Sequence, residues 1–284
     1  MISIQEILMS LDIGMIYGII AIGIYLTFRT INFSDLTCDG SFVFGAAVSA
    51  VLIKQGINPY IAILAAFLSG GIAGLFTGVL NVYFKITDLL SGIIVAFMLY
   101  SINLKVMGNS PNITFADNIT IFSFSKNIHL LNFSIITIIA LFFVHLLYTS
   151  FGLALRSIGN NKNFSNIAGI NVNFLTITGL FISNGLIGFG GAMFTQYQGF
   201  CDISQGFGTL VIGLASVIIG ESLIKFKNTC LMILTCLVGS VIYRIFISTA
   251  LHSDVFGIET QDLNLITGIM IIIIIFTKQR RVKC

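Results

Sequence analysis

Residues 18–37 read GIIAIGIYLTFRTINFSDLT, and residues 185–204 read GLIGFGGAMFTQYQGFCDIS. At one constant offset two glycine pairs align, and Phe33-x-Asp35 of the first stretch aligns with Phe200-x-Asp202 of the second. In both stretches an apolar run ends at the Phe-x-Asp motif, and another apolar run begins after it. The pattern indicates a structural repeat in which each copy carries a break between two apolar segments.

The composition around these stretches is typical of a polytopic membrane protein. Of the 284 residues, 56% are hydrophobic and only 9% are charged, whereas a soluble domain carries about 25% charged residues. The 28 glycines fit this class because glycine lets membrane helices approach closely. No basic tract is dense enough to predict a nucleic-acid partner. The first residues contain Glu6 and Asp12 but no Lys or Arg, so we expect no cleavable secretory signal.

The motifs of metal sites, nucleotide sites and hydrolases are missing from the sequence. The five cysteines are scattered without zinc-ligand spacing, so we interpret them as small apolar side chains and expect neither metal nor cofactor. The chain has no GxxxxGK(S/T) motif and therefore no P-loop of its own. HExxH and GxSxG are missing as well, so no catalytic residue is predicted and the chain is not expected to be an enzyme.

Apolar windows of about 20 residues, the length that crosses a bilayer, predict nine transmembrane spans. They lie near residues 7–28, 36–54, 60–84, 89–107, 133–150, 175–198, 207–224, 229–250 and 263–277. The expected fold is all-α: a single polytopic membrane domain over residues 1–284, with repeat halves near 1–132 and 133–284. The longest polar connection, 108–132, alternates Thr and Phe and suggests a small extramembrane hairpin.

The positive charges predict how the chain is oriented. With the amino terminus outside, ten of the 14 Lys and Arg residues fall on the cytoplasmic side, where such residues are retained. The carboxyl terminus is then expected in the cytoplasm. The two repeat copies open on the first and sixth spans, so they cross the bilayer in opposite directions. This is the layout of an inverted-topology repeat, which is common in transporters.

The carboxylates at the breaks are the first candidates for function. A carboxylate in hydrocarbon costs about 2.5–3.5 kcal/mol on insertion scales, so it belongs where a helix is interrupted. Such a group can cap the next helix or line the permeation path, and both interpretations stay open. An amide inside a span can likewise bond a neighbouring helix or touch substrate. The candidate pathway residues are Asn32, Asp35, Asp39, Asn184, Gln198 and Asp202.

A polar stretch, FGLALRSIGNNKNFSNIAGI, separates the fifth and sixth predicted spans. Within it Asn161 or Asn163 can cap a short helix, and Gly169 can stop that helix. Phe164 and Ile167 then lie on one face of the helix. Because two helical turns are not stable alone in water, this apolar face predicts a partner. The alternative is that the face packs against the protein's own helix ends.

This stretch and the span after it resemble bacterial ABC importer permeases of the branched-chain amino acid and ribose type. The motif residues that match are Gly152, Arg156, Ser157, Gly159 and Asn161, followed by Gly169, Ile170 and Asn171. In that family the loop, about 151–174 here, docks into a separate ATP-binding subunit. The resemblance implies that the coupling residues are Arg156, Asn163, Phe164, Ile167, Gly169 and Glu221. Glu221 is expected to pair with Lys225, Lys227 or Arg156.

Residues 31–46 resemble the family's break near the substrate path, and residues 198–221 are similar to a single-permease offshoot associated with import of aromatic amino acids. The resemblance implies a permease of the bacterial inner membrane that works with a cytosolic ABC ATPase, a periplasmic solute-binding protein and a second permease copy in the lipid bilayer. The extra first span of ribose-type members is not found here. The alternative is an ion-driven secondary transporter in which Asp35 and Asp202 bind the coupling ions.

Overall fold

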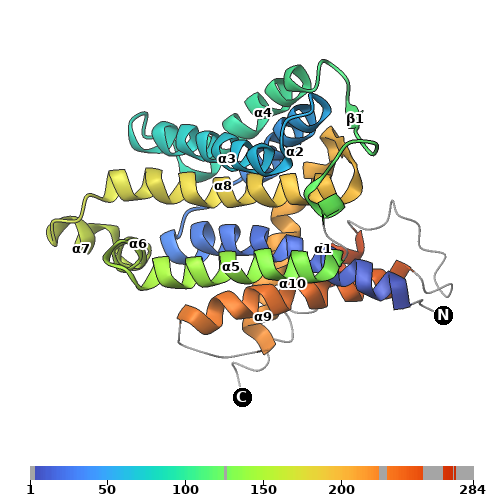
Figure 1. The fold of residues 1–284 in the computed structure, drawn as a ribbon. Helices are drawn as coiled ribbons and strands as arrows, with labels where there is room; N and C mark the ends of the chain where they lie inside the picture. Colours follow the sequence, from blue (N-terminus) through green and yellow to red (C-terminus); the bar gives the residue numbers. More distant parts are fainter. Residues whose placement is uncertain (1–3, 125–126, 224–228, 252–264, 271, 273–284) are drawn as a thin grey trace.

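The computed structural model describes residues 4–124, 127–223, 229–251, 265–270 and 272, which form a bundle of helices (Figure 1). The helices are α1 (Ile4–Tyr25), α2 (Cys38–Lys54), α3 (Pro59–Val82), α4 (Asp88–Val106), α5 (Ile128–Tyr148), α6 (Ser150–Asn160), α7 (Lys162–Ile167), α8 (Val172–Gln198), α9 (Thr209–Leu223) and α10 (Thr229–Leu251). The π-helical turn η1 (Leu26–Ile31) continues α1, and the short elements are η2 (Ile121–Phe124), η3 (Ile203–Gly206), β1 (Asn112–Thr114) and β2 (Phe200–Asp202).

The predicted all-α membrane fold is confirmed. Within the described residues, seven helical segments are long and apolar enough to cross a membrane. The second predicted span corresponds to α2, which has only 17 residues. The fifth span begins at Ile128, before its predicted start at 133. The ninth, predicted at 263–277, lies mostly outside the described residues.

The two repeat copies fold alike. In the first, α1 and η1 lead into an irregular segment at 32–37 and then into α2; in the second, α8 leads through β2 and η3 into α9. Figure 1 shows α1 and α8 running in opposite directions across the bundle. Each copy is therefore a membrane-length helix, a break and a shorter helix, as an inverted repeat requires.

The predicted hairpin within 108–132 is wrong. β1 pairs antiparallel with β2 instead, with Ile113 opposite Cys201. At the end of α8 the chain turns at Gly199, whose φ is 78°, and becomes extended beside β1. Each strand supplies the backbone hydrogen-bond partners of the other. The pairing thus joins two connections that are far apart in the sequence. This sheet lies at the end of the bundle opposite α6 and α7 (Figure 1).

Close packing of α3 along α8 depends on glycine. A Cβ atom at Gly70 would lie 2.4 Å from a backbone oxygen of α8, and one at Gly74 would lie 2.2 Å from the carbonyl oxygen of Leu180. On α2, a Cβ atom at Gly45 would lie 2.2 Å from the carbonyl oxygen of Gly188. Such small residues let backbones touch where no larger side chain fits. These glycines thus pack helices of one chain together.

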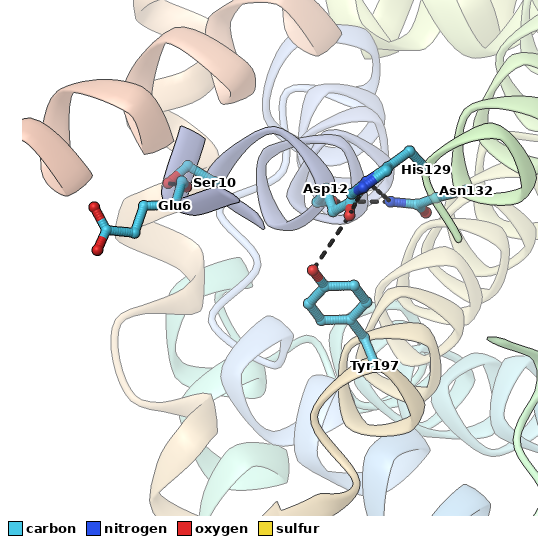
Figure 2. Close-up of polar contacts among 6 residues, drawn as sticks. All are labelled: Glu6, Ser10, Asp12, His129, Asn132 and Tyr197. Atoms are coloured by element: carbon cyan, nitrogen blue, oxygen red, sulfur yellow. Dashed lines mark hydrogen bonds and ion pairs between the residues drawn. The ribbon is translucent and has the colours of Figure 1, made fainter. Parts of the chain in front are cut away.

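A buried carboxylate connects α1, α5 and α8 (Figure 2). Asp12 is fully buried, and its Oδ2 lies 2.6 Å from Nδ1 of His129 and accepts a hydrogen bond of 3.2 Å from the hydroxyl of Tyr197. Asn132 donates to the backbone carbonyl of Asp12 over 3.0 Å. The sequence did not predict this cluster, because nothing in the order of residues places α5 and the end of α8 against the start of α1.

Replacing Gly74 by Val is expected to lower the melting temperature of the detergent-solubilised protein. The new side chain meets a backbone carbonyl that cannot move aside, and overpacking of this kind costs about 1–3 kcal/mol. The control is Leu75→Val, which places the same side chain at the neighbouring, exposed position. Equal melting temperatures for the two variants, measured by size-exclusion chromatography after heating, would contradict the glycine-dependent interface.

Replacing His129 by Ala is expected to lower the free energy of unfolding by about 1–3 kcal/mol, because Asp12 stays buried and loses a hydrogen-bond partner. The imidazole is half-exposed, so the cost comes from the carboxylate rather than from lost packing. His145→Ala, at an exposed position near the other end of α5, is the control. If both variants unfold at the same temperature, the cluster does not stabilise the junction of these helices.

Candidate functional site

The break after η1 is held by Asp35, which is fully buried. Its Oδ1 accepts a hydrogen bond of 2.8 Å from the backbone N–H of Thr37, and its Oδ2 accepts one of 2.6 Å from the amide of Asn184 on α8. The hydroxyl of Ser41 donates to Oδ1 of Asn184 over 2.7 Å. Two predicted pathway residues are thus brought together. Every contact satisfies a polar group that would otherwise be costly in the membrane.

Asp39 connects the two breaks of the repeat. It lies in the first turn of α2, and its Oδ1 accepts a hydrogen bond of 2.8 Å from the backbone N–H of Leu210, while Oδ2 lies 3.4 Å from the N–H of Gly208. The N–H groups at the start of a helix have no acceptor within that helix. Asp39 accepts from two of them and so caps α9 from another helix. A Cβ atom at Gly206 would lie 2.4 Å from the carbonyl oxygen of Asp39. The two shorter helices therefore begin side by side.

A cavity of about 470 Å³ opens beside this junction, between α2, α4 and the segment that follows β2. Phe97, Tyr100 and Asn103 line it from α4, and Phe207 lines it from the second break. Asp39 is the one charged side chain among the lining residues in the part of the chain that the structure describes. The volume is typical of a small-molecule site, and so is a mostly apolar wall with a few polar groups.

The remaining predicted pathway residues lie outside the buried network. Asn32 ends η1 in a left-handed conformation, with φ of 58°, and is exposed. Gln198 is exposed at the end of α8, where its Oε1 accepts a hydrogen bond of 3.0 Å from Gln205. Asp202 caps η3 by accepting a bond of 2.7 Å from the backbone N–H of Ser204. The six predicted residues therefore do not form one site, and a pathway role for these three stays a prediction.

The structure places an apolar face on the exposed helix α7. Asn161 caps the helix by accepting a hydrogen bond of 3.0 Å from the N–H of Phe164, and Gly169 follows its end with φ of 79°. The predicted start and stop are confirmed, with Asn161 rather than Asn163 as the cap. Phe164 is 63% exposed and Ile167 is 86% exposed. The alternative, that this face packs against the protein's own helix ends, is wrong.

Helix α6 attaches α7 to the bundle. The hydroxyl oxygens of Ser157 on α6 and Ser165 on α7 lie 2.8 Å apart. A Cβ atom at Gly159 of α6 would lie 2.0 Å from the carbonyl oxygen of Thr30, so this part of α6 rests directly on η1. Helix α6 therefore joins α7 to the turn that precedes the first break.

Glu221, near the end of α9, forms an ion pair with Arg29 of η1, at 2.5 Å between Oε2 and Nη2. The sequence did not predict Arg29 as a partner, since the two residues lie on different repeat copies. Of the expected partners, Lys225 and Lys227 lie outside the described residues, and Arg156 donates a bond of 3.0 Å to a backbone carbonyl of α5. The ion pair connects the cytoplasmic ends predicted for α1 and α9.

The cysteines whose side chains the structure describes are packing residues. Cys38, Cys201 and Cys236 are buried and free. Burial raises the pKa of the Cys201 thiol to about 12, so it is protonated at neutral pH and unreactive. Among the described residues no three His, Cys, Asp or Glu side chains are grouped to hold a metal ion.

Comparison with known proteins identifies the family. A family model described as the permease component of branched-chain amino acid transport systems matches residues 6–275. The tyrosine transport system permease protein of Clostridioides difficile (strain R20291) is 42% identical over 277 residues, which cover 93% of this chain and 88% of that protein. The inner membrane ABC transporter permease protein YjfF of Escherichia coli (strain K12) is 28% identical over 73% of this chain and 65% of that protein.

The fold agrees with that family. A solved structure described as an inward-facing conformation of a metal-chelate type ABC transporter covers 95% of this chain and 86% of its own, with a TM-score of 0.55 and 17% identity. At this identity the likeness concerns the fold alone. Because the family match spans nearly the whole chain, this protein belongs to the branched-chain amino acid transport permease family and is the multi-pass permease component of an ABC transport system, which implies a separate ATPase partner.

Proposed function

We propose that this permease imports an aromatic amino acid across the bacterial inner membrane, and that its ATPase partner docks on α7. The observation that carries the docking role is the pair of exposed apolar side chains, Phe164 and Ile167, on a helix fixed to the bundle. An apolar surface of this kind marks a site of protein interaction. The two residues lie three positions apart, which is the spacing by which a short helix is read in a groove.

The docking helix is formed before its partner arrives. The Asn161 cap and the contact between Ser157 and Ser165 hold a six-residue helix that would not be stable alone. A preformed helix loses little conformational entropy on binding, so more of the contact energy is available for affinity. The coupling residues predicted on this loop, Phe164 and Ile167 above all, keep that role in the proposal.

Motion of the ATPase reaches the break through a short series of contacts. The backbone at Gly159 packs against the carbonyl oxygen of Thr30 in η1. η1 leads directly into the segment whose Asp35 is hydrogen-bonded to Asn184 of α8. A π-helical turn is a frequent feature of functional sites in helices. We infer that the nucleotide state of the ATPase biases the position of η1, and with it one of two packings of the bundle. The ion pair between Arg29 and Glu221 connects the second repeat copy to the same movement.

Our proposals for the solute and for the remaining partners rest on the relatives of this chain and on the arrangement of its helices. The 42% identical relative is named as a tyrosine permease, which supports an aromatic amino acid as the solute here. We further propose that the amino terminus lies outside and the carboxyl terminus inside, that a solute-binding protein delivers the solute near the β1–β2 sheet, and that two copies form the pathway. These partners are those that the sequence resemblance implies.

An ion-driven mechanism receives less support. A coupling ion would have to reach the carboxylate at the first break, but Asp35 is fully buried, and each of its oxygens already accepts a hydrogen bond from a protein donor. Membership of an ABC permease family also supplies an energy source, because the ATPase partner hydrolyses the nucleotide.

Proteoliposomes that contain the permease, its ATPase and its solute-binding protein are expected to accumulate labelled L-tyrosine when ATP is supplied to the ATPase. Uptake should persist when ionophores collapse the proton and sodium gradients, because ATP alone biases the bundle. Vanadate, an inhibitor of the ATPase cycle, should stop it. Uptake that needs an ion gradient and ignores vanadate would favour the secondary transporter instead.

Replacing Ile167 by Asp is expected to prevent co-purification of the permease with its ATPase, because a charge at the centre of the apolar contact would be buried without a partner. Membrane insertion should be unchanged, since the side chain is 86% exposed. Asn166→Asp places the same charge at the preceding exposed position and should retain most of the complex. Co-elution of Ile167→Asp at the wild-type ratio would show that α7 is not the docking element.

A further inference from the structure

We propose that the cavity between α2, α4 and the second break binds the aromatic amino acid in transit, with the carboxylate of Asp39 facing its ammonium group and the rings of Phe97 and Phe207 packing on its side chain. The inference rests on the proposed function and deepens it by naming the groups that recognise the solute. Three independent features of the cavity support it: a charge, an unsatisfied amide and an aromatic wall.

The charge of the cavity selects a cation. Among the described residues that line it, Asp39 is the one charged side chain, and that side chain is only partly buried. The carboxylate accepts hydrogen bonds from two backbone N–H groups at the start of α9. Two carboxylate oxygens offer about four acceptor sites, so capacity for an ammonium group remains. Apolar walls around the carboxylate strengthen its attraction for that group.

The side-chain oxygen of Asn103 is an acceptor to which no described group donates a hydrogen bond. The side chain is 1% exposed, and its amide nitrogen donates a hydrogen bond of 3.3 Å to the carbonyl oxygen of Gly40. Its Oδ1 is buried and has no hydrogen-bond partner in the described part of the chain. Buried polar atoms in native proteins nearly always have partners, so an unsatisfied oxygen on a residue that lines the cavity points to a ligand that brings an N–H or O–H group once the side chain turns toward it.

The walls suit an aromatic side chain. Phe97, Tyr100 and Asn103 follow each other at steps of three on α4, so they share one face of that helix. Phe207, from the segment after β2, contributes a second ring to the lining, and Phe97 and Phe207 are 75% and 66% exposed. Aromatic rings attract one another in offset or edge-to-face arrangements, and an ammonium group is attracted to a ring face. An aromatic amine satisfies all three features of the cavity.

A tryptophan reporter tests this site directly, because the chain contains no Trp. The full-length permease with Phe97→Trp, in lipid nanodiscs, is titrated with L-tyrosine, tyramine and N-acetyl-L-tyrosine while the Trp emission is recorded. L-tyrosine and tyramine should give saturable changes. N-acetyl-L-tyrosine, which has lost the ammonium group, should bind about tenfold more weakly or worse. Met98→Trp, at the next position but outside the cavity lining, should show no saturable change.

A second change tests the role of the charge. Asp39→Asn in the Phe97→Trp protein keeps an oxygen that can accept the hydrogen bond of Leu210 and removes the charge. It should weaken binding of L-tyrosine and of tyramine about tenfold. Should this variant lose the monodisperse elution of the folded protein, Asn103→Leu serves in its place and should weaken L-tyrosine binding by removing the buried acceptor.

The outcomes separate this site from the proposed function. No saturable response of Phe97→Trp, in a complex that imports L-tyrosine with ATP, overturns the site and leaves the function standing. Equal binding of L-tyrosine and N-acetyl-L-tyrosine, or an equal response of Met98→Trp, indicates partitioning into lipid and also overturns the site. Failure of the wild-type complex to import any aromatic amino acid contradicts the proposed function, whatever the reporter shows.

Discussion

The hydrogen bonds that Asp39 accepts from the start of α9 are the constraint on which the rest of the structure depends. A helix that begins inside a membrane exposes N–H groups that hydrocarbon cannot satisfy. Here the carboxylate of one interrupted helix satisfies the donors of the other, while Asp35 satisfies the first break itself. Each repeat copy therefore satisfies polar groups of the other: Asp39 accepts from the start of α9, and Asn184 of α8 donates to Asp35. The breaks are thus tied together at the place where the cavity opens.

Glycine makes this junction geometrically possible. Gly45 and Gly70 let α2 and α3 approach the backbone of α8, and that approach places Asn184 within hydrogen-bond distance of Asp35. Larger residues would move these helices apart and leave a buried carboxylate and a buried amide without partners. Close packing and polar satisfaction therefore depend on each other here, which explains why so polar a network is stable in so apolar a chain.

The two ends of the bundle carry different features, and the first break lies between them. At one end α7 offers an apolar face and α6 rests on η1 through Gly159. At the other end β1 pairs with β2, and the cluster around Asp12 joins α1, α5 and α8. The segment after η1 lies between these ends, joined to α8 by Asp35. In the proposed function, this segment is the route by which the nucleotide state of the ATPase would act on the cavity.

The sequence by itself determined the membrane class, most of the spans, the repeat, the cap and stop of α7, and the presence of carboxylates at both breaks, because these follow from composition, periodicity and local capping. Only the tertiary structure decided which break residue meets which partner. Asp39 reaches Leu210, Glu221 reaches Arg29, and β1 pairs with a strand after α8 rather than with its neighbour. The reason is physical: such contacts depend on how inverted helices stack, and the order of residues along one chain does not specify that stacking.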